Sequence, residues 1–124
     1  MSQDIKFYIH KSQSANALGK LILSLDTEGI YIHTNDTTHA KKISDNLWAY
    51  PDRFIPNSLD PQSPQPVILI GYGDIPNDRL LIINASNTFV TPTHIEWISE
   101  DIEAGKTRYR QWTKQGAHPT ITNV

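Results

Sequence analysis

Four residues near the end of the sequence have the types and spacing of a binding site for an acidic segment. Lys106, Arg110 and Lys114 follow one another at four-residue steps, so a helix places these cations along one flank. Tyr109 and Trp112 belong to a packing face with helical spacing beside that flank. Cations pair with carboxylates, and an aromatic face accepts an apolar side chain. The stretch therefore predicts binding of a short acidic peptide that carries an apolar residue.

The distribution of charge along the sequence leaves two explanations for these cations. The net charge is −2, but residues 1–103 hold seven Lys or Arg and thirteen Asp or Glu, whereas residues 104–124 hold four cations and no acid. A solvated helix whose cations favour the carboxyl end of its own dipole explains the pattern as well as a binding site does. Direct binding to bare nucleic acid is disfavoured, because such proteins carry a clear basic excess. Arg108 projects to the other flank, and we expect it to pair with an acidic residue elsewhere.

A second candidate surface lies in residues 47–56, which are unusually rich in aromatic and apolar residues for a loop. Trp48 falls about 100° beyond Leu47 on a helix, off the inward stripe to which Leu47 belongs. Phe54 lies in a loop bordered by prolines, one of which is Pro56. Exposed aromatic side chains are typical anchors of protein interfaces. The alternative is that both side chains cover one edge of the sheet.

Sites for catalysis and metal binding are not indicated. The sequence has no cysteine, which excludes a thiolate nucleophile, a disulfide framework and a cysteine zinc site. It has no HExxH or GxSxG motif. Its five histidines are scattered, and we expect hydrogen-bonded structural roles for His10, His33 and His94, which fall at or near strand ends. We expect a protein that is not an enzyme and binds no metal or cofactor.

Phosphate binding has one weak candidate, the turn Gly71-Tyr72-Gly73-Asp74. The turn His10–Ser14 after the first strand lacks the glycines that bring backbone amides close to a pyrophosphate, and no GxxxxGK[ST] loop occurs. Gly73 lies between two expected strands, where glycine commonly supplies a positive φ in a turn. A small nucleotide-binding enzyme that uses Gly71–Asp74 remains the alternative from a different functional class.

The elements that must position these residues alternate between strand and helix. The expected strands are Ile5–His10, Ile30–Thr34, Val67–Ile70, Leu80–Ile83 and one around His94–Ile98, and the expected helices are Ser12–Leu25, a helix capped by Asn35 or Asp36 that runs to about Ala49, and one from about Asp101 to Gln115 that ends at Gly116. Five prolines exclude regular structure from residues 51–66. The order predicts an α/β fold, a single Rossmann-like three-layer domain over residues 1–124 with a mainly parallel sheet flanked by helices.

The location of the protein is expected to be the cytoplasm. The longest apolar runs fall far short of the roughly 20 residues that a membrane span needs. The first residues show no basic cluster followed by an apolar stretch, so no secretory signal is expected.

Motifs in a fixed order give the sequence a resemblance to a known family. They are Phe7-Tyr8 in the first strand, Leu47-Trp48-Ala49-Tyr50-Pro51 followed by Phe54-Ile55-Pro56, Pro66-Val67-Ile68-Leu69-Ile70, and Arg108-Tyr109-Arg110-Gln111-Trp112 closing at Gly116. Each motif alone is weak, but their order over most of the chain resembles the chi subunit family of the bacterial DNA polymerase III holoenzyme. The resemblance implies a non-catalytic adaptor of the clamp-loader assembly in the bacterial replisome, which meets nucleic acid only indirectly and no membrane.

The resemblance also implies two partners. One is the psi subunit, whose contact in the family uses the region that here holds Trp48, Phe54 and Pro56; in some members a DNA-repair helicase shares that contact. The other is the acidic C-terminal tail of single-stranded DNA-binding protein, which ends in phenylalanine. The family holds this tail at the positions that match Lys106, Tyr109, Arg110 and Lys114, in agreement with the interpretation of the same residues from their spacing.

Three departures from the family pattern bear on these contacts. Asn57 stands where the family commonly has histidine, and Thr113 stands where a basic residue is frequent. The first helix is short. Loss of a charge at Thr113 is expected to weaken tail binding or shift the contact to Lys114, and the shorter first half bears on the psi contact.

Overall fold

The computed structural model of the protein describes residues 4–9, 16–25, 27–51, 53–98 and 102–123. The elements in chain order are β1 (Asp4–Ile9), α1 (Ala17–Leu25), β2 (Ile30–His33), α2 (Thr37–Trp48), β3 (Asn57–Ser58), β4 (Ile68–Gly71), β5 (Leu81–Asn84), β6 (Ile95–Ile98), α3 (Ile102–Lys114) and β7 (His118–Asn123). The five predicted strands and three predicted helices are all present in the predicted order, as β1, α1, β2, α2, β4, β5, β6 and α3. The starts predicted at Ser12 and Asp101, and the strand end at His10, lie outside the described residues.

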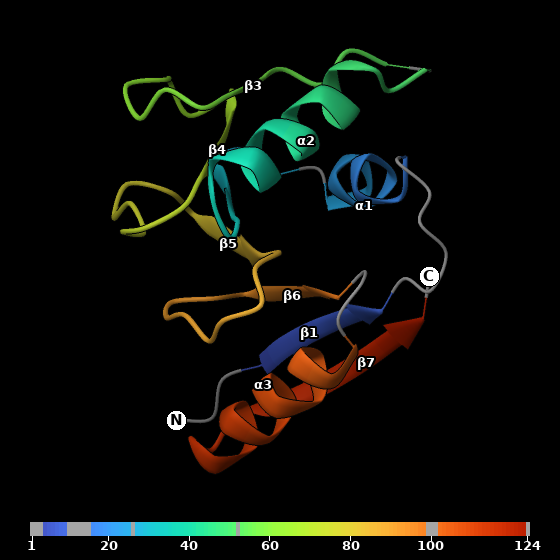
Figure 1. The fold of residues 1–124 in the computed structure, drawn as a ribbon, viewed down its shortest axis with the longest axis vertical. Helices are drawn as coiled ribbons and strands as arrows, with labels where there is room; N and C mark the ends of the chain where they lie inside the picture. Colours follow the sequence, from blue (N-terminus) through green and yellow to red (C-terminus); the bar gives the residue numbers. More distant parts are fainter. Residues whose placement is uncertain (1–3, 10–15, 26, 52, 99–101, 124) are drawn as a thin grey trace.

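The strands form one sheet in the order β3-β4-β2-β5-β6-β1-β7, and each pair of neighbours is parallel. Helices α1 and α2 lie together at one end of the molecule, and α3 lies at the other end against β1 and β7 (Figure 1). The predicted parallel sheet flanked by helices is therefore confirmed. Parallel strands are connected by crossovers, which cover both faces of the sheet with helices or loops.

Among the described residues, three clusters of buried apolar residues pack on this sheet. One consists of Tyr31, Leu69 and Ile82, and the two cores that contact helices lie on opposite faces. The larger joins α1 and α2 to the sheet through residues such as Ile32, Ile70 and Leu47. The smaller lies beneath α3 and consists of Ile5, Phe7, Ile98, Trp112 and Ala117. Successive side chains of a strand point to opposite faces, so Trp97 joins the first core and Ile98 the second. Helix α3 is thus packed separately from α1 and α2.

Capping residues determine where α2 begins and where α3 ends. Asp36 is the N-cap of α2, and its carboxylate accepts a hydrogen bond of 2.9 Å from the backbone N–H of His39. Gly116 follows α3 with φ of +83°, a conformation that favours glycine and ends the helix. Both residues had this role in the sequence-based expectation, which left Asn35 or Asp36 open, and the structure selects Asp36.

Two strands differ from expectation. The segment 51–66 was expected to hold no regular structure, and this is wrong at β3, where Asn57 and Ser58 pair with Ile68 and Leu69 of β4. These two residues fit between Pro56 and Pro61, so no proline interrupts their pairing. Strand β7 was not predicted and pairs with β1 from Asp4↔His118 to Ile9↔Asn123. As the last strand in the sheet order, β7 tolerates Pro119 because an edge strand does not need every N–H.

The pairing between β5 and β6 is short and is supplemented by side chains. The register joins Ile83 to Ile95 and Asn84 to Glu96, whereas four residue pairs join β6 to β1. At one end the N–H of Ile82 donates to Nδ1 of His94 over 3.0 Å, and at the other Nδ2 of Asn84 donates to Glu96 over 3.0 Å. Burial lowers the pKa of His94, so its ring accepts this bond in the neutral form.

The structural role expected for His33 is also confirmed. Its Nδ1 lies 3.1 Å from the hydroxyl of Tyr31, and burial lowers the pKa of His33. Burial also raises the pKa of Tyr31 to about 12, so the hydroxyl keeps its proton for this bond at neutral pH.

Candidate functional site

An apolar groove of about 310 Å³ lies between α3 and the strands beneath it. Its lining consists of Phe7, Ile9, Ile98, Ile102, Gly105, Lys106, Tyr109, Arg110 and Ile121. The floor comes from β1, β6 and β7, and one wall comes from α3. Three of the four residues predicted to bind the acidic tail, Lys106, Tyr109 and Arg110, are brought together here.

The charges of the groove lie at its rim. Arg110 is exposed, and Nζ of Lys106 forms an exposed ion pair of 3.2 Å with Oε1 of Glu103. An exposed pair of this kind contributes about 0–1 kcal/mol, so an incoming carboxylate can replace Glu103 at little cost. Lys114, the fourth predicted residue, is exposed one turn further on and is not part of the lining. Thr113 is exposed and donates its hydroxyl to the carbonyl of Tyr109 over 2.9 Å, so it adds no charge here.

The shape of the groove depends on two residues of α3. A Cβ added to Gly105 would lie 2.9 Å from Cγ2 of Ile98, closer than real contacts allow, so glycine permits α3 to approach β6. The ring of Tyr109 meets Phe7 edge to face, with 5.5 Å between the ring centroids. This geometry is favourable for aromatic pairs and holds Tyr109 at the side of the groove.

The opposite side of α3 is fixed by a buried polar network. Glu96 is fully buried and accepts hydrogen bonds from Nε of Arg108 over 2.9 Å and from Nε1 of Trp112 over 2.8 Å. The expected pairing of Arg108 with an acidic residue is confirmed. Burial raises the pKa of Glu96, while the charge of Arg108 and the hydrogen bonds from Trp112, Arg108 and Asn84 oppose that rise. The network joins α3 to β6 and so determines which residues of α3 face the groove.

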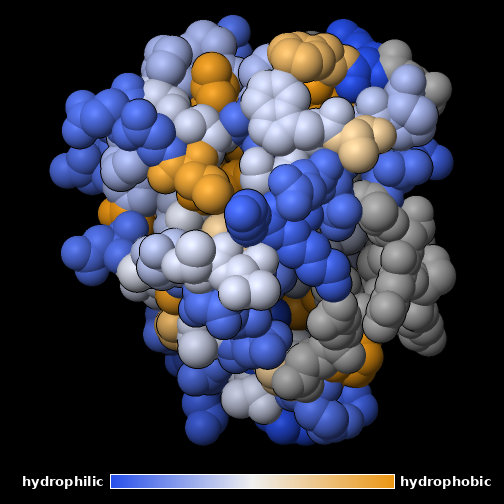
Figure 2. All heavy atoms as spheres, turned by 45° about the horizontal axis from the view of Figure 1, so that its top comes forward, coloured by the Kyte–Doolittle hydropathy of each residue, from blue (hydrophilic) through white to orange (hydrophobic). Residues whose placement is uncertain are grey.

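Trp48 and Phe54 form an exposed aromatic pair at the end of α2. Their ring centroids are 4.9 Å apart, and 46% of Trp48 and 74% of Phe54 remain exposed. The predicted exposure of both is confirmed, and Pro56 is also exposed. In the view that brings the α2 and β3 end forward, hydrophobic side chains stand singly among hydrophilic ones (Figure 2). Apolar residues that stand singly on a surface are ordinary, so this pair is a candidate for an interface because two large aromatic side chains meet here and both stay exposed.

The loop that carries Phe54 is anchored on both sides of Pro56. Ile55 is 3% exposed and belongs to the larger core. Asn57 is buried, accepts a hydrogen bond of 2.5 Å from Ser44 of α2, and donates to the carbonyl of Ile55 over 2.9 Å. The residue that departs from the family pattern thus holds the loop against α2.

The turn Gly71–Asp74 has the geometry of a connection. Gly71 ends β4, and its carbonyl accepts hydrogen bonds from both the N–H and the hydroxyl of Thr34. Gly73 has φ of +96°, and a Cβ added there would meet no atom within 4 Å. The expectation of a turn with positive φ is confirmed.

The part of the chain that the structure describes holds neither a cluster of metal ligands nor a helix that could span a membrane. No three His, Cys, Asp or Glu side chains lie together as metal ligands do. None of the helices combines the length and the apolar character that crossing a membrane requires.

Sequence reasoning missed the floor of the groove. Phe7, Ile9 and Ile121 come from the two ends of the chain, and Ile121 belongs to the unpredicted β7. The run Thr120-Ile121-Thr122 was the available signal for β7. It follows Gly116, which ends a helix, and a run of β-branched residues is typical of a strand. Glu96 was also missed, although a carboxylate inside the apolar run Ile95–Ile98 indicates a partnered buried charge.

Comparison with known proteins gives one match. The model of the family described as DNA polymerase III chi subunit, HolC, matches residues 1–120. No curated protein and no solved structure matches the chain. The family match covers nearly all of the 124 residues, including α2, α3 and the residues of both surfaces except Ile121 of the groove. The chain therefore belongs to the DNA polymerase III chi subunit family, whose members are non-catalytic accessory subunits in DNA replication.

Proposed function

We propose that the chain bridges the clamp loader, through the psi subunit, to the acidic C-terminal tail of single-stranded DNA-binding protein. The observation that carries the proposal is the apolar groove with Lys106 and Arg110 at its rim. A tail with carboxylates and a terminal phenylalanine offers one apolar group for the floor and several anions for the rim. The groove beside α3 offers an apolar floor for the phenylalanine and cations at the rim for the carboxylates.

The dimensions of the groove support a side chain as its occupant. A volume of about 310 Å³ is ten times the roughly 30 Å³ that one water takes in the liquid. A floor of Phe7, Ile9 and Ile121 offers no hydrogen bonds to water, so filling it with an aromatic ring is favourable. The guanidinium of Arg110 can hold a carboxylate at the rim through two hydrogen bonds.

The aromatic pair is our proposed contact for the psi subunit, together with Pro56. Trp48 ends α2 and Phe54 lies in the following loop, which Ile55 and Asn57 hold in place, and both side chains expose large apolar surfaces. Such side chains lose little conformational freedom on binding, since two χ angles describe each of them. A DNA-repair helicase is a second partner for the same surface.

The test is a fluorescence-anisotropy titration with a labelled acidic peptide that ends in phenylalanine, at low and high salt. We expect saturable binding that weakens with salt. Arg110→Ala should weaken it by about 5- to 160-fold, which corresponds to the roughly 1–3 kcal/mol lost with a charged hydrogen bond.

Arg53→Ala is the matched control, because Arg53 is an exposed arginine beside the aromatic pair. It should leave the affinity unchanged. An Arg110→Ala variant that binds as tightly as the unmodified protein refutes the groove as the tail site. A peptide without its terminal phenylalanine should bind weakly, and equal binding would show that charge alone acts.

A further inference from the structure

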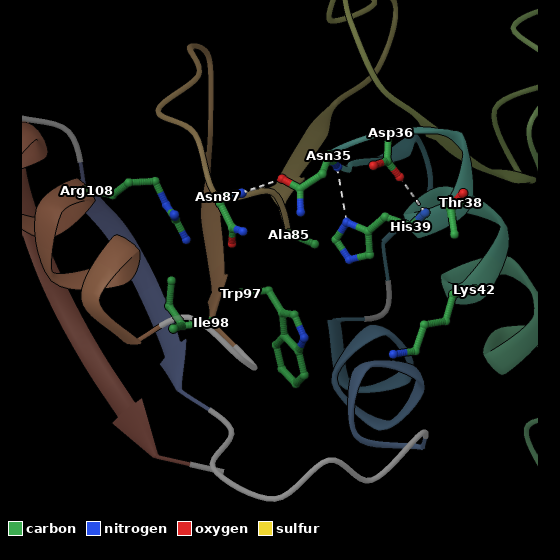
Figure 3. A pocket seen from close by; sticks show the side chains of 10 residues that line it. All are labelled: Asn35, Asp36, Thr38, His39, Lys42, Ala85, Asn87, Trp97, Ile98 and Arg108. Carbon is green, nitrogen blue, oxygen red and sulfur yellow. Dashed lines mark hydrogen bonds between the residues drawn. The ribbon is translucent and has the colours of Figure 1, made fainter.

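A second cavity, the polar pocket, has a volume of about 260 Å³ and lies at the carboxyl ends of β2, β5 and β6. Its wall consists of the first turns of α2, the residues after β5, the end of β6 and one residue of α3 (Figure 3). Helix α2 follows β2 to one face of the sheet, whereas α3 follows β6 to the other. Open parallel sheets bind ligands in the crevice where the connections diverge in this way.

A buried donor in this pocket lacks a partner. Arg108 is 2% exposed, and its Nε is bound to Glu96. Its Nη1 is buried and has no hydrogen-bond partner among the described residues. The guanidinium points from α3 toward Asn87 and the pocket (Figure 3). A buried donor without an acceptor costs about 1–3 kcal/mol, so an acceptor at this position stabilises the protein.

The residues around this donor are held in place. The N–H of Asn87 donates to Oδ1 of Asn35 over 2.7 Å, and the N–H of Asn35 donates to Nδ1 of His39 over 3.1 Å. These bonds connect the loop after β5 to α2, and the Asn87 side chain lies between Arg108 and Ala85 (Figure 3). A pocket with fixed walls binds a ligand without the cost of ordering them.

The donors of the lining suit an oxyanion. Nη1 of Arg108 and the side-chain amide of Asn87 can each donate a hydrogen bond, and the carboxylate of Asp36 already accepts the N–H of His39. The volume suits a small group rather than a whole dinucleotide, because ligand pockets run from about 300 to 1,000 Å³. We propose that the polar pocket binds the phosphate or carboxylate group of a small ligand through Nη1 of Arg108 and the side-chain amide of Asn87.

This site is separate from the proposed peptide site. Arg108 lines the polar pocket and Arg110 lines the apolar groove, so a small anion in the pocket and a peptide in the groove do not compete for these residues. The two inferences can therefore fail independently.

The experiment is a titration of the ¹⁵N-labelled full chain with inorganic phosphate and, separately, with acetate, at constant ionic strength set by chloride. Saturable shifts of the Asn35 and Asn87 backbone amides and of the Arg108 Nε–H are expected. Saturation with phosphate alone identifies a phosphate ligand, and saturation with acetate alone identifies a carboxylate ligand. Saturation with both supports a general oxyanion site, and saturation with neither overturns the proposal.

Asn87→Asp should weaken phosphate binding by at least tenfold, because it places a carboxylate beside Arg108. Asn77→Asp makes the same charge change at an exposed residue outside the pocket and should bind like the unmodified chain. Equal weakening in both variants overturns the site. The acidic-peptide titration verifies that Asn87→Asp is folded, and Asn87→Ala takes its place if peptide binding is lost.

Discussion

The apolar groove and the aromatic pair differ in what holds them. The groove is formed by regular elements, and Phe7 and Ile98 belong both to its lining and to the smaller core. The aromatic pair lies outside both cores and depends on its neighbours Ile55 and Asn57 for its position. A substitution beneath α3 therefore changes stability and binding together, whereas a substitution in the aromatic pair changes binding alone. The following experiments test that difference, from the largest expected effect to the smallest.

The largest effect is expected from Glu96→Ala, which removes the acceptor shared by Arg108 and Trp112. We expect a loss of about 3–5 kcal/mol in the free energy of unfolding, because a buried guanidinium is left without its counter-charge. Urea denaturation gives this value, and the acidic-peptide titration should show weaker binding as α3 loses its attachment. Glu96→Gln retains a carbonyl acceptor and should lose less. A loss below about 1 kcal/mol for Glu96→Ala would contradict the role of the network.

Phe54→Ala should weaken binding to a partner and leave the stability of the fold nearly unchanged, in contrast to Glu96→Ala. The side chain is 74% exposed, so the free energy of unfolding should change by no more than about 0.5 kcal/mol. Binding of a psi subunit should weaken by about 2 kcal/mol or more, the loss typical of an aromatic anchor, and peptide binding should stay unchanged. Calorimetric titration with a purified psi subunit measures the loss of affinity for psi. The control is Leu59→Ala, at another exposed apolar residue. If Phe54→Ala weakens both partners, the two surfaces are not independent.

A pH dependence should report on the short β5–β6 pairing. Burial lowers the pKa of His94 in the folded protein, so the unfolded chain binds the proton more readily. Its contribution to stability is complete above the unfolded value of about 6.5 and is lost as the pH falls below that value toward the folded pKa. Thermal denaturation at pH 7.5 and at pH 5.5 should show this loss, and His94→Gln should reduce it. His118→Gln, at an exposed histidine of β7, should leave the pH dependence of stability unchanged. An equal reduction in both variants would show that this dependence does not come from His94.

The smallest effect is expected from Glu103→Gln. This change removes the ion pair with Lys106 and frees the ammonium group for the peptide. Affinity for the acidic peptide should rise by about 1.4- to 5-fold, which corresponds to the roughly 0.2–1 kcal/mol of an exposed pair. The rise should disappear at high salt, and Lys106→Gln together with Glu103→Gln should abolish it. Weaker binding by Glu103→Gln would show that Glu103 itself contacts the peptide.

The sequence predicted what depends on neighbouring residues. Asp36 caps α2 and Gly116 ends α3 because capping requires only the nearest turn. The exposure of Trp48 followed from its angle on α2. The acidic partner of Arg108 was expected, but Glu96 was not identified, because the pairing depends on how α3 lies across β6. The floor of the groove was not predictable for the same reason, since Phe7 and Ile121 meet only once β1 and β7 are neighbours.

The boundary between β5 and β6 has a mechanical consequence. It lies between the block that carries the aromatic pair, with β3, β4 and β2, and the block that carries the groove, with β1 and β7. Partners that pull apart on the two surfaces would apply tension across the sheet. Two residue pairs resist that tension at β5–β6, against four at each neighbouring boundary. The side-chain bonds of His94 and Glu96 reinforce this boundary, where a stretched bridge would be expected to part first.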